Sequence, residues 1–484
     1  MRHKYKTKNM TVNHMKKKIH SFTDDVLGTQ DATGIAELIR NKDITASEAL
    51  EASINRAEKT EPILRGIQYA DFQRARQQAK TDSYQQGIFA GVPSIIKDNN
   101  DVQGLPTRHG SIATPSKPAK QDGVLVKQLF AQGIVNIGKS TMPEFGLSCS
   151  VEPAHGEPSR NPWNTDYSCG GSSGGAAVLV AAGVLPIAHA NDGGGSTRIP
   201  AACCGLVGLK PSRGRLVVNE QAKDLPINIV ADGVVTRSVR DTAHFYAGAE
   251  QYYKNPALTN IGLVTSANSR RLRVGYIIDS VTGSPTDSET RKTVEKTAQL
   301  LRDLGHDVQE ASLPITPKFA EDFTLYWAML SFSLHRLGRI VVAPSFQGNK
   351  VDGLTEGLSK LYQKNIHKTP LFMRRLKQCY HDYAASFNQY DVMLSPVLAH
   401  TTPEIGHLDP SQDFETMMDK LTRYASFTPL NNASGGPAIS LPMGHSTNNL
   451  PIGMQFAANH GDERTLLELA FELEEAQPWK TIYS

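Results

Sequence analysis

The sequence has few cysteines and no long apolar run, and both absences narrow the class of protein. Its five cysteines form no C-x-x-C pair, and no histidine lies at metal-ligand spacing from them. We therefore expect reduced thiols, no metal site and no disulfide framework, as in a cytosolic protein. The longest apolar run, residues 176–190, contains Gly183, Pro186 and His189. It is too short for a membrane span, which needs about 18 apolar residues, so we expect a soluble, cytoplasmic protein without a membrane partner.

Acidic residues are missing from the first 20 positions, which carry seven basic ones. Removing these seven charges from the net charge of +3 leaves −4 for the rest of the chain. A basic arm can bind nucleic acid, but this one lacks interleaved aromatic residues and the apolar segment of a secretory signal. We interpret residues 1–30 as a disordered leader, with Met10 or Met15 as alternative first residues, and expect no nucleic-acid partner.

Short apolar runs alternate with helical segments along the rest of the chain. Thr45 and Glu48 form a capping box that predicts a helix start, and apolar periodicity predicts another helix over 288–304. Four apolar runs predict buried strands, at 91–98, 133–138, 271–279 and 391–397. This alternation favours an α/β sheet covered by helices. No low-complexity linker divides the chain, so we predict one domain over 31–484, with a helical, pocket-lining insertion at 315–385.

The segment Gly133–Ser140 reads GIVNIGKS and matches the phosphate-binding pattern G-x-x-x-x-G-K-[ST]. Three of its four variable positions are β-branched apolar residues, which favour a strand and do not easily wrap their amides around a phosphate. Pro143 would fall in the first turn of the helix that a phosphate loop requires, and would remove an amide there. We interpret the segment as a buried strand that ends in a turn.

Two glycine-rich segments suggest nucleophilic chemistry. The stretch GGSSGG contains the G-x-S-x-G pattern twice, centred on Ser172 and Ser173, although a loop-like segment precedes it where that pattern needs a strand. Ser196 ends a second segment, which begins with three consecutive glycines, Gly193, Gly194 and Gly195. Their unshielded N–H groups can converge on a tetrahedral oxyanion. Asp192 and Arg198 flank this turn, and either pair to hold its shape or form a solvated pair with a purely structural role.

A serine nucleophile needs a base that takes its proton. His155 and His189 lie near the two glycine-rich segments in sequence. Lys97 is the third candidate, because it ends an apolar run and burial would lower the pKa of its ammonium group. The residues by themselves leave all three bases open.

Taken together, these segments resemble the amidase signature family over about residues 30–480, and most strongly over a core at about 91–215. The matching stretches, in order, are GVPSIIKDN, GKSTMPEFG, NPWN, GGSSGGAA, NDGGGSTRIPAACCGLVGLKPSRGR, NNASGGPAISLP and PIGMQF. The HAND stretch at 189–192 is similar to the branch of the nylon-oligomer cyclic-dimer hydrolase. The resemblance implies an α/β fold with a large mixed, twisted sheet covered by helices on both faces. It also implies an amidohydrolase that cleaves a linear or cyclic carboxylic amide.

For individual residues, the resemblance implies a Ser–cisSer–Lys triad. Ser196 would attack the amide carbonyl and form an acyl-enzyme, Ser172 would follow a cis peptide bond and relay protons, and neutral Lys97 would be the general base. The oxyanion hole would consist of the backbone amides of Gly193, Gly194, Gly195 and Ser196. Ser173 would support the site by hydrogen bonds, and Gly146 would offer backbone contact to the substrate.

Two positions depart from the usual family pattern, since Asn191 replaces Thr or Ser and Thr197 replaces Ile or Val. The alternatives are the A subunit of glutaminyl-tRNA amidotransferase, with partner subunits and tRNA, and a nucleotide-binding protein that uses Gly133–Ser140. The HAND stretch and the acidic body argue against the first alternative. We expect a small-molecule amide as substrate, no metal or organic cofactor, and a pocket wall from the insertion and the 425–440 loop; a homodimer is compatible with this interpretation.

Overall fold

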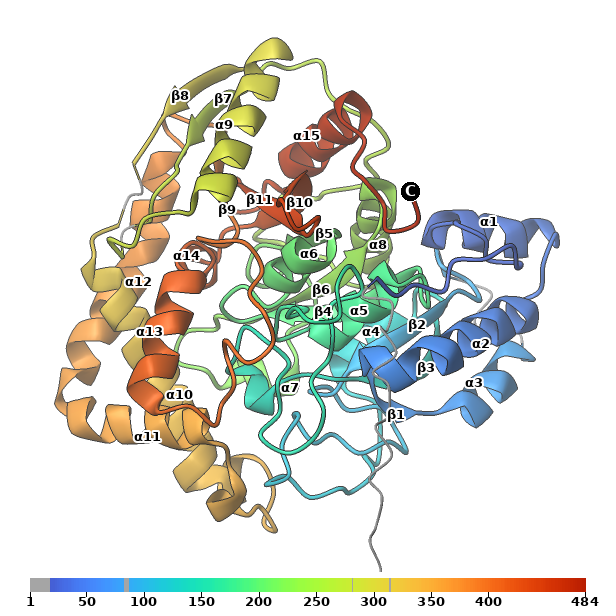
Figure 1. The fold of residues 1–484 in the computed structure, drawn as a ribbon, viewed down its shortest axis with the longest axis horizontal. Helices are drawn as coiled ribbons and strands as arrows, with labels where there is room; N and C mark the ends of the chain where they lie inside the picture. The colour runs from blue at the N-terminus through green and yellow to red at the C-terminus, as the bar shows by residue number, and fades with distance from the viewer. Residues whose placement is uncertain (1–17, 82–86, 281, 313–314) are drawn as a thin grey trace, which may run out of the picture.

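The computed structural model describes residues 18–81, 87–280, 282–312 and 315–484, and two β-sheets organise them (Figure 1). The smaller sheet has the order β1-β3-β2 and consists of β1 (Ile67–Ala70), β2 (Pro93–Lys97) and β3 (Val135–Ser140). β2 runs parallel to β3, and β1 runs antiparallel to it. This sheet places the end of β2, and Lys97 with it, beside the larger sheet.

The larger sheet has eight strands in the order β4-β6-β5-β10-β11-β9-β7-β8. β7 is parallel to β8 and β9, and the remaining neighbours are antiparallel. Its strands are β4 (Ile187–Asp192), β5 (Val207–Lys210), β6 (Ala231–Thr236), β7 (Arg273–Tyr276), β8 (Asp307–Glu310), β9 (Val392–Pro396), β10 (Ala438–His445) and β11 (Pro451–Ala457). The large mixed sheet is confirmed, and the four strands predicted from apolar runs are present as β2, β3, β7 and β9.

Helices cover both faces of this sheet, because its strands send alternate side chains into two apolar cores. On β4, Ala188 and Ala190 belong to one core and Ile187 to the other. The first core also contains α5 and α6, and the second contains α8, α9 and α15. The helices outside the 315–385 segment are α1 (Ala32–Asn41), α2 (Ala46–Leu64), α3 (Phe72–Ala79), α4 (Val124–Phe130), α5 (Gly174–Ala181), α6 (Arg198–Cys204), α7 (Glu220–Lys223), α8 (Val239–Tyr252), α9 (Ser288–Asp303), α13 (Phe414–Tyr424), α14 (Pro429–Ser434) and α15 (Glu463–Ala476).

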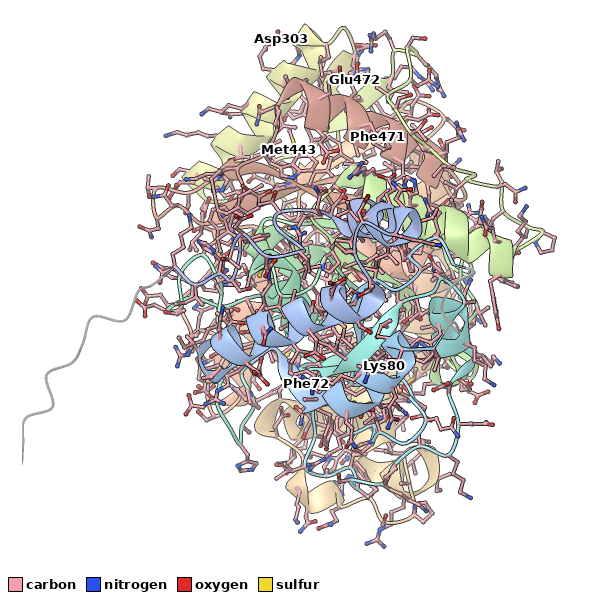
Figure 2. The ribbon with its side chains drawn as sticks, turned by 90° about the vertical axis from the view of Figure 1, so that its right-hand side faces the viewer. Phe72, Lys80, Asp303, Met443, Phe471 and Glu472 are labelled. Atoms are coloured by element: carbon pink, nitrogen blue, oxygen red, sulfur yellow. The ribbon has the colours of Figure 1, made fainter. Side chains whose placement is uncertain are left out.

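The helices near the N-terminus follow the sequence signals closely. Thr45 and Glu48 form both hydrogen bonds of the predicted capping box at the start of α2. Figure 2 shows α2 beside α3, with Phe72 and Lys80 at the two ends of α3. The helix predicted over 288–304 is present as α9.

The predicted helical insertion consists of α10 (Lys318–Val341), α11 (Gly353–Asn365) and α12 (Thr369–Ser386). It lies on the opposite side of the molecule from α1, α2 and α3 (Figure 1). Within the described ranges, no helix is both long and apolar enough to cross a bilayer.

The predicted disordered leader is wrong for residues 18–30, because these residues pack against the body. The Ile19 N–H donates to Pro162 O at 2.8 Å, and Asp25 forms an ion pair with the buried Arg56 at 2.5 Å. The rest of the predicted leader, residues 1–17, lies outside the described residues.

The segment that matches a phosphate loop forms β3, as the apolar interpretation predicts. Every residue of β3 is buried, and the Lys139 side chain is fully buried. Lys139 Nζ donates to Thr107 Oγ1 at 3.1 Å and lies 3.4 Å from Asp98 Oδ1. The nucleotide-binding alternative is therefore wrong, because the segment is a sheet strand and its lysine is held by an internal carboxylate.

Candidate active site

Lys97, the last residue of β2, lies at the centre of a buried polar cluster. Its side chain is fully buried. Lys97 Nζ lies 2.7 Å from Ser172 Oγ, 2.8 Å from Ser173 Oγ and 2.7 Å from Asn191 Oδ1. Burial lowers the pKa of Lys97 to about 7, although the carboxylates of Asp232 and Asp192 act in the opposite direction. A neutral amine at Lys97 is therefore accessible near neutral pH.

The serine pair lies between the two sheets, just before α5. The peptide bond between Gly171 and Ser172 is cis, as the resemblance implies. Ser173 Oγ donates to Asn191 O at 3.1 Å and accepts from the Asn191 N–H at 3.2 Å. The Ser173 N–H donates to Ser196 O at 3.2 Å. These bonds attach the serine pair to β4 and to the glycine turn that follows it.

The glycine turn between β4 and α6 is held by a buried ion pair. Arg198 Nε and Nη2 donate to the two carboxylate oxygens of Asp192, each at 2.9 Å, and both side chains are fully buried. Burial would raise the pKa of Asp192, but the Arg198 guanidinium holds it well below its usual range. Asp192 and Arg198, which the sequence left as either a shape-holding or a solvated pair, are therefore paired across the turn.

The predicted oxyanion hole needs one correction, at Gly195. The Gly195 N–H donates to Asp192 Oδ1 at 2.7 Å, so this amide is not free to bind an oxyanion. Gly195 has a φ of +130°, and a Cβ at this position would lie 2.4 Å from Thr428 Oγ1. Gly193, Gly194 and Ser196 line a cavity, and no protein group in the described part of the chain accepts from their N–H groups. These three amides remain the candidate oxyanion donors.

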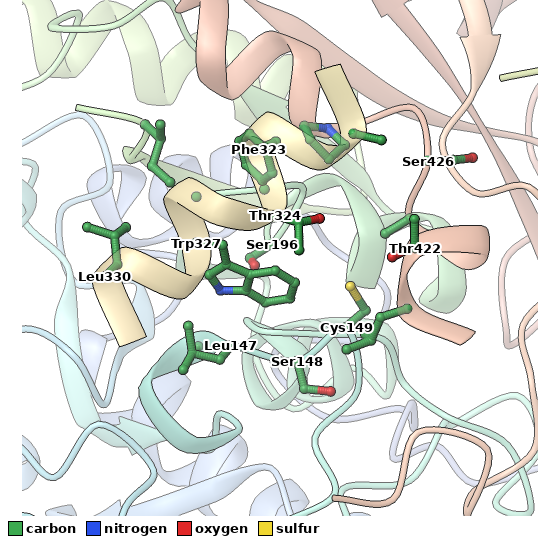
Figure 3. A pocket seen from close by; sticks show the side chains of 18 of the residues that line it. Leu147, Ser148, Cys149, Ser196, Phe323, Thr324, Trp327, Leu330, Thr422 and Ser426 are labelled. Carbon is green, nitrogen blue, oxygen red and sulfur yellow. The ribbon is translucent and has the colours of Figure 1, made fainter. Parts of the chain in front are cut away.

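Ser196 lies in the wall of a cavity of about 180 Å³ (Figure 3). Among the described residues, no protein group is hydrogen-bonded to its hydroxyl, so this hydroxyl is available to a bound molecule. Gly146 lines the same cavity, at a φ of +72°, and a Cβ there would lie 3.1 Å from Ser172 Oγ. The structure thus brings the predicted residues Gly146, Ser172 and Ser196 together at one site.

The cavity wall is predominantly apolar, includes several serine and threonine hydroxyls, and carries no charged side chain among its described residues. Figure 3 shows Phe323, Trp327 and Leu330 projecting from α10, and all three line the cavity together with Ser196. Leu147 and Cys149 contribute from the turn after β3. The insertion therefore lines the cavity as predicted, but only through its first helix, since α11 and α12 do not line it. The expected 425–440 loop contributes residues 425, 426 and 429, and its middle forms the helix α14.

Glu144 fixes the turn that carries Gly146. This buried carboxylate accepts from Ser111 Oγ at 2.6 Å, from Thr355 Oγ1 at 2.8 Å and from the Asp352 N–H at 2.6 Å. Asp352 caps the N-terminus of α11. The helical insertion is thereby joined to one wall of the candidate site.

Neither histidine occupies the position of a base next to Ser196. His155 is exposed on the loop after residue 150. His189 is buried, accepts the Lys97 N–H on Nδ1 at 3.2 Å and places Nε2 3.3 Å from Asp232 Oδ1. His189 thus supports the backbone of Lys97.

Asn191 is the residue of the site that the sequence analysis did not assign. The sequence marked it only as a departure from the family pattern. A usable signal was present, because residues two apart on a strand share a face, so Asn191 faces the same neighbour as His189. From this face of β4, the amide oxygen of Asn191 accepts a hydrogen bond from Lys97 Nζ.

The described ranges hold no group of three or more His, Cys, Asp or Glu side chains that could bind a metal ion. All five cysteines are free, and Cys169, Cys203 and Cys204 are buried in the apolar core.

The site thus brings together a buried lysine, a serine pair and a glycine turn beside a mixed sheet. The family model "Amidase" matches residues 48–467, and the chain belongs to this family. It is 47% identical over 466 residues to "Putative amidase AmiC" of Mycobacterium leprae, covering 96% of this chain and 99% of the relative. It is 32% identical to the 6-aminohexanoate-cyclic-dimer hydrolase of Pseudomonas sp. (strain NK87), covering 93% of this chain and 95% of the relative.

Solved structures agree with this assignment. The structure of 6-aminohexanoate cyclic dimer hydrolase complexed with substrate superimposes with a TM-score of 0.83 at 31% identity, covering 94% of this chain and 98% of that chain. The predicted membership of the amidase family and the similarity to the cyclic-dimer hydrolase are confirmed. The protein is an enzyme that hydrolyses an amide C–N bond.

Proposed function

We propose that the protein hydrolyses uncharged, apolar amides through an acyl-enzyme on Ser196, with Lys97 as the general base and Ser172 as the proton relay. The observation that carries this proposal is the buried Lys97 Nζ at 2.7 Å from Ser172 Oγ, beside a cavity lined by Ser196. Lysine can act as a base only when its amine is neutral, and a buried amine without a carboxylate in direct contact favours that state.

The reaction divides into acylation and hydrolysis. Ser196 Oγ attacks the amide carbonyl, its proton passes to Ser172 Oγ, and the Ser172 proton passes to Lys97 Nζ. The N–H groups of Gly193, Gly194 and Ser196 stabilise the negative oxygen of the tetrahedral intermediate. The C–N bond then breaks, and the leaving amine takes back a proton from Lys97 through Ser172. Water then attacks the carbonyl of the acyl-enzyme, and its proton passes through Ser172 to Lys97. The bond to Ser196 Oγ breaks, Ser196 takes back a proton, and the carboxylic acid is released.

The absence of charge from the described cavity wall supports an apolar substrate. Burying a charged group without a partner costs several kcal/mol. Free glutamine carries an ammonium and a carboxylate group, for which this wall offers no counter-charge. The cavity therefore favours an aryl, aliphatic or cyclic amide over the glutamine that an amidotransferase subunit would use. A small-molecule partner and a cytoplasmic location remain part of the proposal, and a homodimer is compatible with it.

Hydrolysis of a matched amide panel tests this function. The purified chain is assayed with a 4-nitroanilide of a short fatty acid, the 6-aminohexanoate cyclic dimer and free glutamine. We expect kcat/KM for at least one uncharged amide to exceed that for glutamine by about a hundredfold or more. Burying the unpaired charges of glutamine costs several kcal/mol, and each 1.4 kcal/mol corresponds to a factor of ten. Ser196→Ala should reduce hydrolysis to below about one thousandth. Preference for glutamine, or full activity of Ser196→Ala, would contradict the proposal.

A further inference from the structure

The hydrogen bonds around Lys97 have directions that the chemistry of the partners fixes. Ser173 Oγ already donates its proton to Asn191 O and accepts from the Asn191 N–H. A hydroxyl has one proton, so Ser173 can only accept from Lys97 Nζ. The amide oxygen Asn191 Oδ1 has no proton and also can only accept from Lys97 Nζ.

A neutral amine has two N–H protons and one lone pair. Ser173 and Asn191 take both protons of neutral Lys97, so the lone pair is left for the third neighbour, Ser172 Oγ at 2.7 Å. The Ser172 O–H therefore donates to Lys97 in the neutral state. Its own lone pairs are then free to accept the proton of Ser196.

We propose that Asn191 is a positioning residue which, together with Ser173, aims the lone pair of Lys97 at Ser172. This inference rests on the proposed function of Lys97 as base. When the proton of Ser196 moves to Ser172 and the Ser172 proton moves to Lys97, the resulting ammonium donates to all three neighbours, and no proton is gained or lost. Asn191 thus holds the same bond to Lys97 in both protonation states.

The Asn191 side chain must be uncharged for this arrangement to work. The charged and titratable groups around Lys97 are Asp192, which Arg198 neutralises, Asp232, and the His189 ring between Asp232 and the Lys97 backbone. No carboxylate in the described part of the chain is hydrogen-bonded to Lys97 Nζ itself. Asn191→Asp would place one there with almost no change of shape, and would stabilise the ammonium form.

The test measures the second-order rate at which an alkyl fluorophosphonate labels Ser196, as a function of pH. This readout needs no knowledge of the natural substrate. Asn191→Asp should move the midpoint of the profile upward by about one pH unit or more. Asn191→Leu should lower the plateau rate by about tenfold to a hundredfold, because the amine is no longer oriented, without changing the affinity for the reagent. Asn136→Leu, at another buried asparagine on β3, is the control and should keep the wild-type plateau and midpoint.

The outcomes separate this inference from the proposed function. If the wild-type chain is not labelled on Ser196, the proposed function fails. If it is labelled there but Asn191→Asp leaves the midpoint unmoved, the role of Asn191 is overturned. Asn191→Thr is a third variant in case the first two do not fold. Its hydroxyl can donate as well as accept, so the direction of the hydrogen bond to Lys97 is no longer fixed. We expect it to lower the plateau rate about three- to tenfold, and a wild-type plateau in this variant would overturn the inference as well.

Discussion

Lys97 and Lys139 lie on the neighbouring parallel strands β2 and β3, and both side chains are fully buried. They differ in their partners. Lys97 Nζ contacts two serine hydroxyls and an amide oxygen, all of them uncharged. Lys139 Nζ contacts the Thr107 hydroxyl and the carboxylate of Asp98. Burial lowers the pKa of both lysines, and for Lys139 the main opposing influence is Asp98.

This difference indicates that the partners of a buried lysine decide its role. A neutral shell leaves the Lys97 amine able to lose and regain a proton during a reaction. The carboxylate of Asp98 forms an ion pair with Lys139. Removal of either partner leaves the charge of the other buried and uncompensated. Under the proposed function, the same residue type is therefore a proton acceptor at position 97 and a structural group at position 139, although both lysines are buried in one small sheet.

The largest difference between the two lysines is expected in kcat/KM when each is replaced by methionine. Lys97→Met should lower kcat/KM for an uncharged amide by about 10²- to 10⁴-fold, the usual contribution of a general base. Its fold should persist, because the hydroxyls and the amide left behind are uncharged and the substitution leaves no buried charge uncompensated. Steady-state kinetics and thermal unfolding measure both effects. Activity of Lys97→Met near that of the wild type would end the distinction between the two lysines.

The pH dependence of kcat/KM should reflect the ionisation of Lys97 and not that of Lys139. Lys97 must be neutral to act, so kcat/KM should rise about tenfold per pH unit up to about pH 7 and then level off. The same pKa lies below the 10.5 of a free lysine, so the unfolded chain binds more protons between these values. This group should therefore make the free energy of unfolding rise with pH from about 7 to 10.5. A profile without the acid limb would contradict the assignment of the base.

The smallest effect on catalysis is expected at the ion pair. Lys139→Met should leave kcat of the folded enzyme within about threefold, but lower the free energy of unfolding by about 3–5 kcal/mol, since Asp98 loses its partner. The double variant with Asp98→Asn should recover most of this stability. Denaturant unfolding and kinetics on the same samples separate the two effects. A loss of kcat as large as that of Lys97→Met would contradict the comparison.

The sequence locates the residues of this site better than their supporting contacts. Ser172, Ser173, Ser196 and Lys97 follow from ordered motifs, because a reaction restricts residue types at fixed spacings. The strand at 135–140 follows from β-branched residues, which favour a pleated and buried environment.

The missed features depend on contacts between segments far apart in the chain. Gly195 resembles its two neighbours in sequence, and only the position of Asp192, fixed by Arg198, removes its N–H from the predicted oxyanion hole. The packing of residues 18–30 depends on partners such as Arg56 and Pro162. No local pattern of composition or periodicity encodes such contacts.

Covalent labelling followed by peptide mapping tests directly whether Ser196 is the nucleophile. The intact chain is treated with an alkyl fluorophosphonate, digested and analysed by mass spectrometry, with Ser196→Ala as the control. We expect one adduct, on Ser196, and none in the control. An adduct on Ser172 or Ser173 that persists in Ser196→Ala would contradict it and would indicate a nucleophile in the GGSSGG segment.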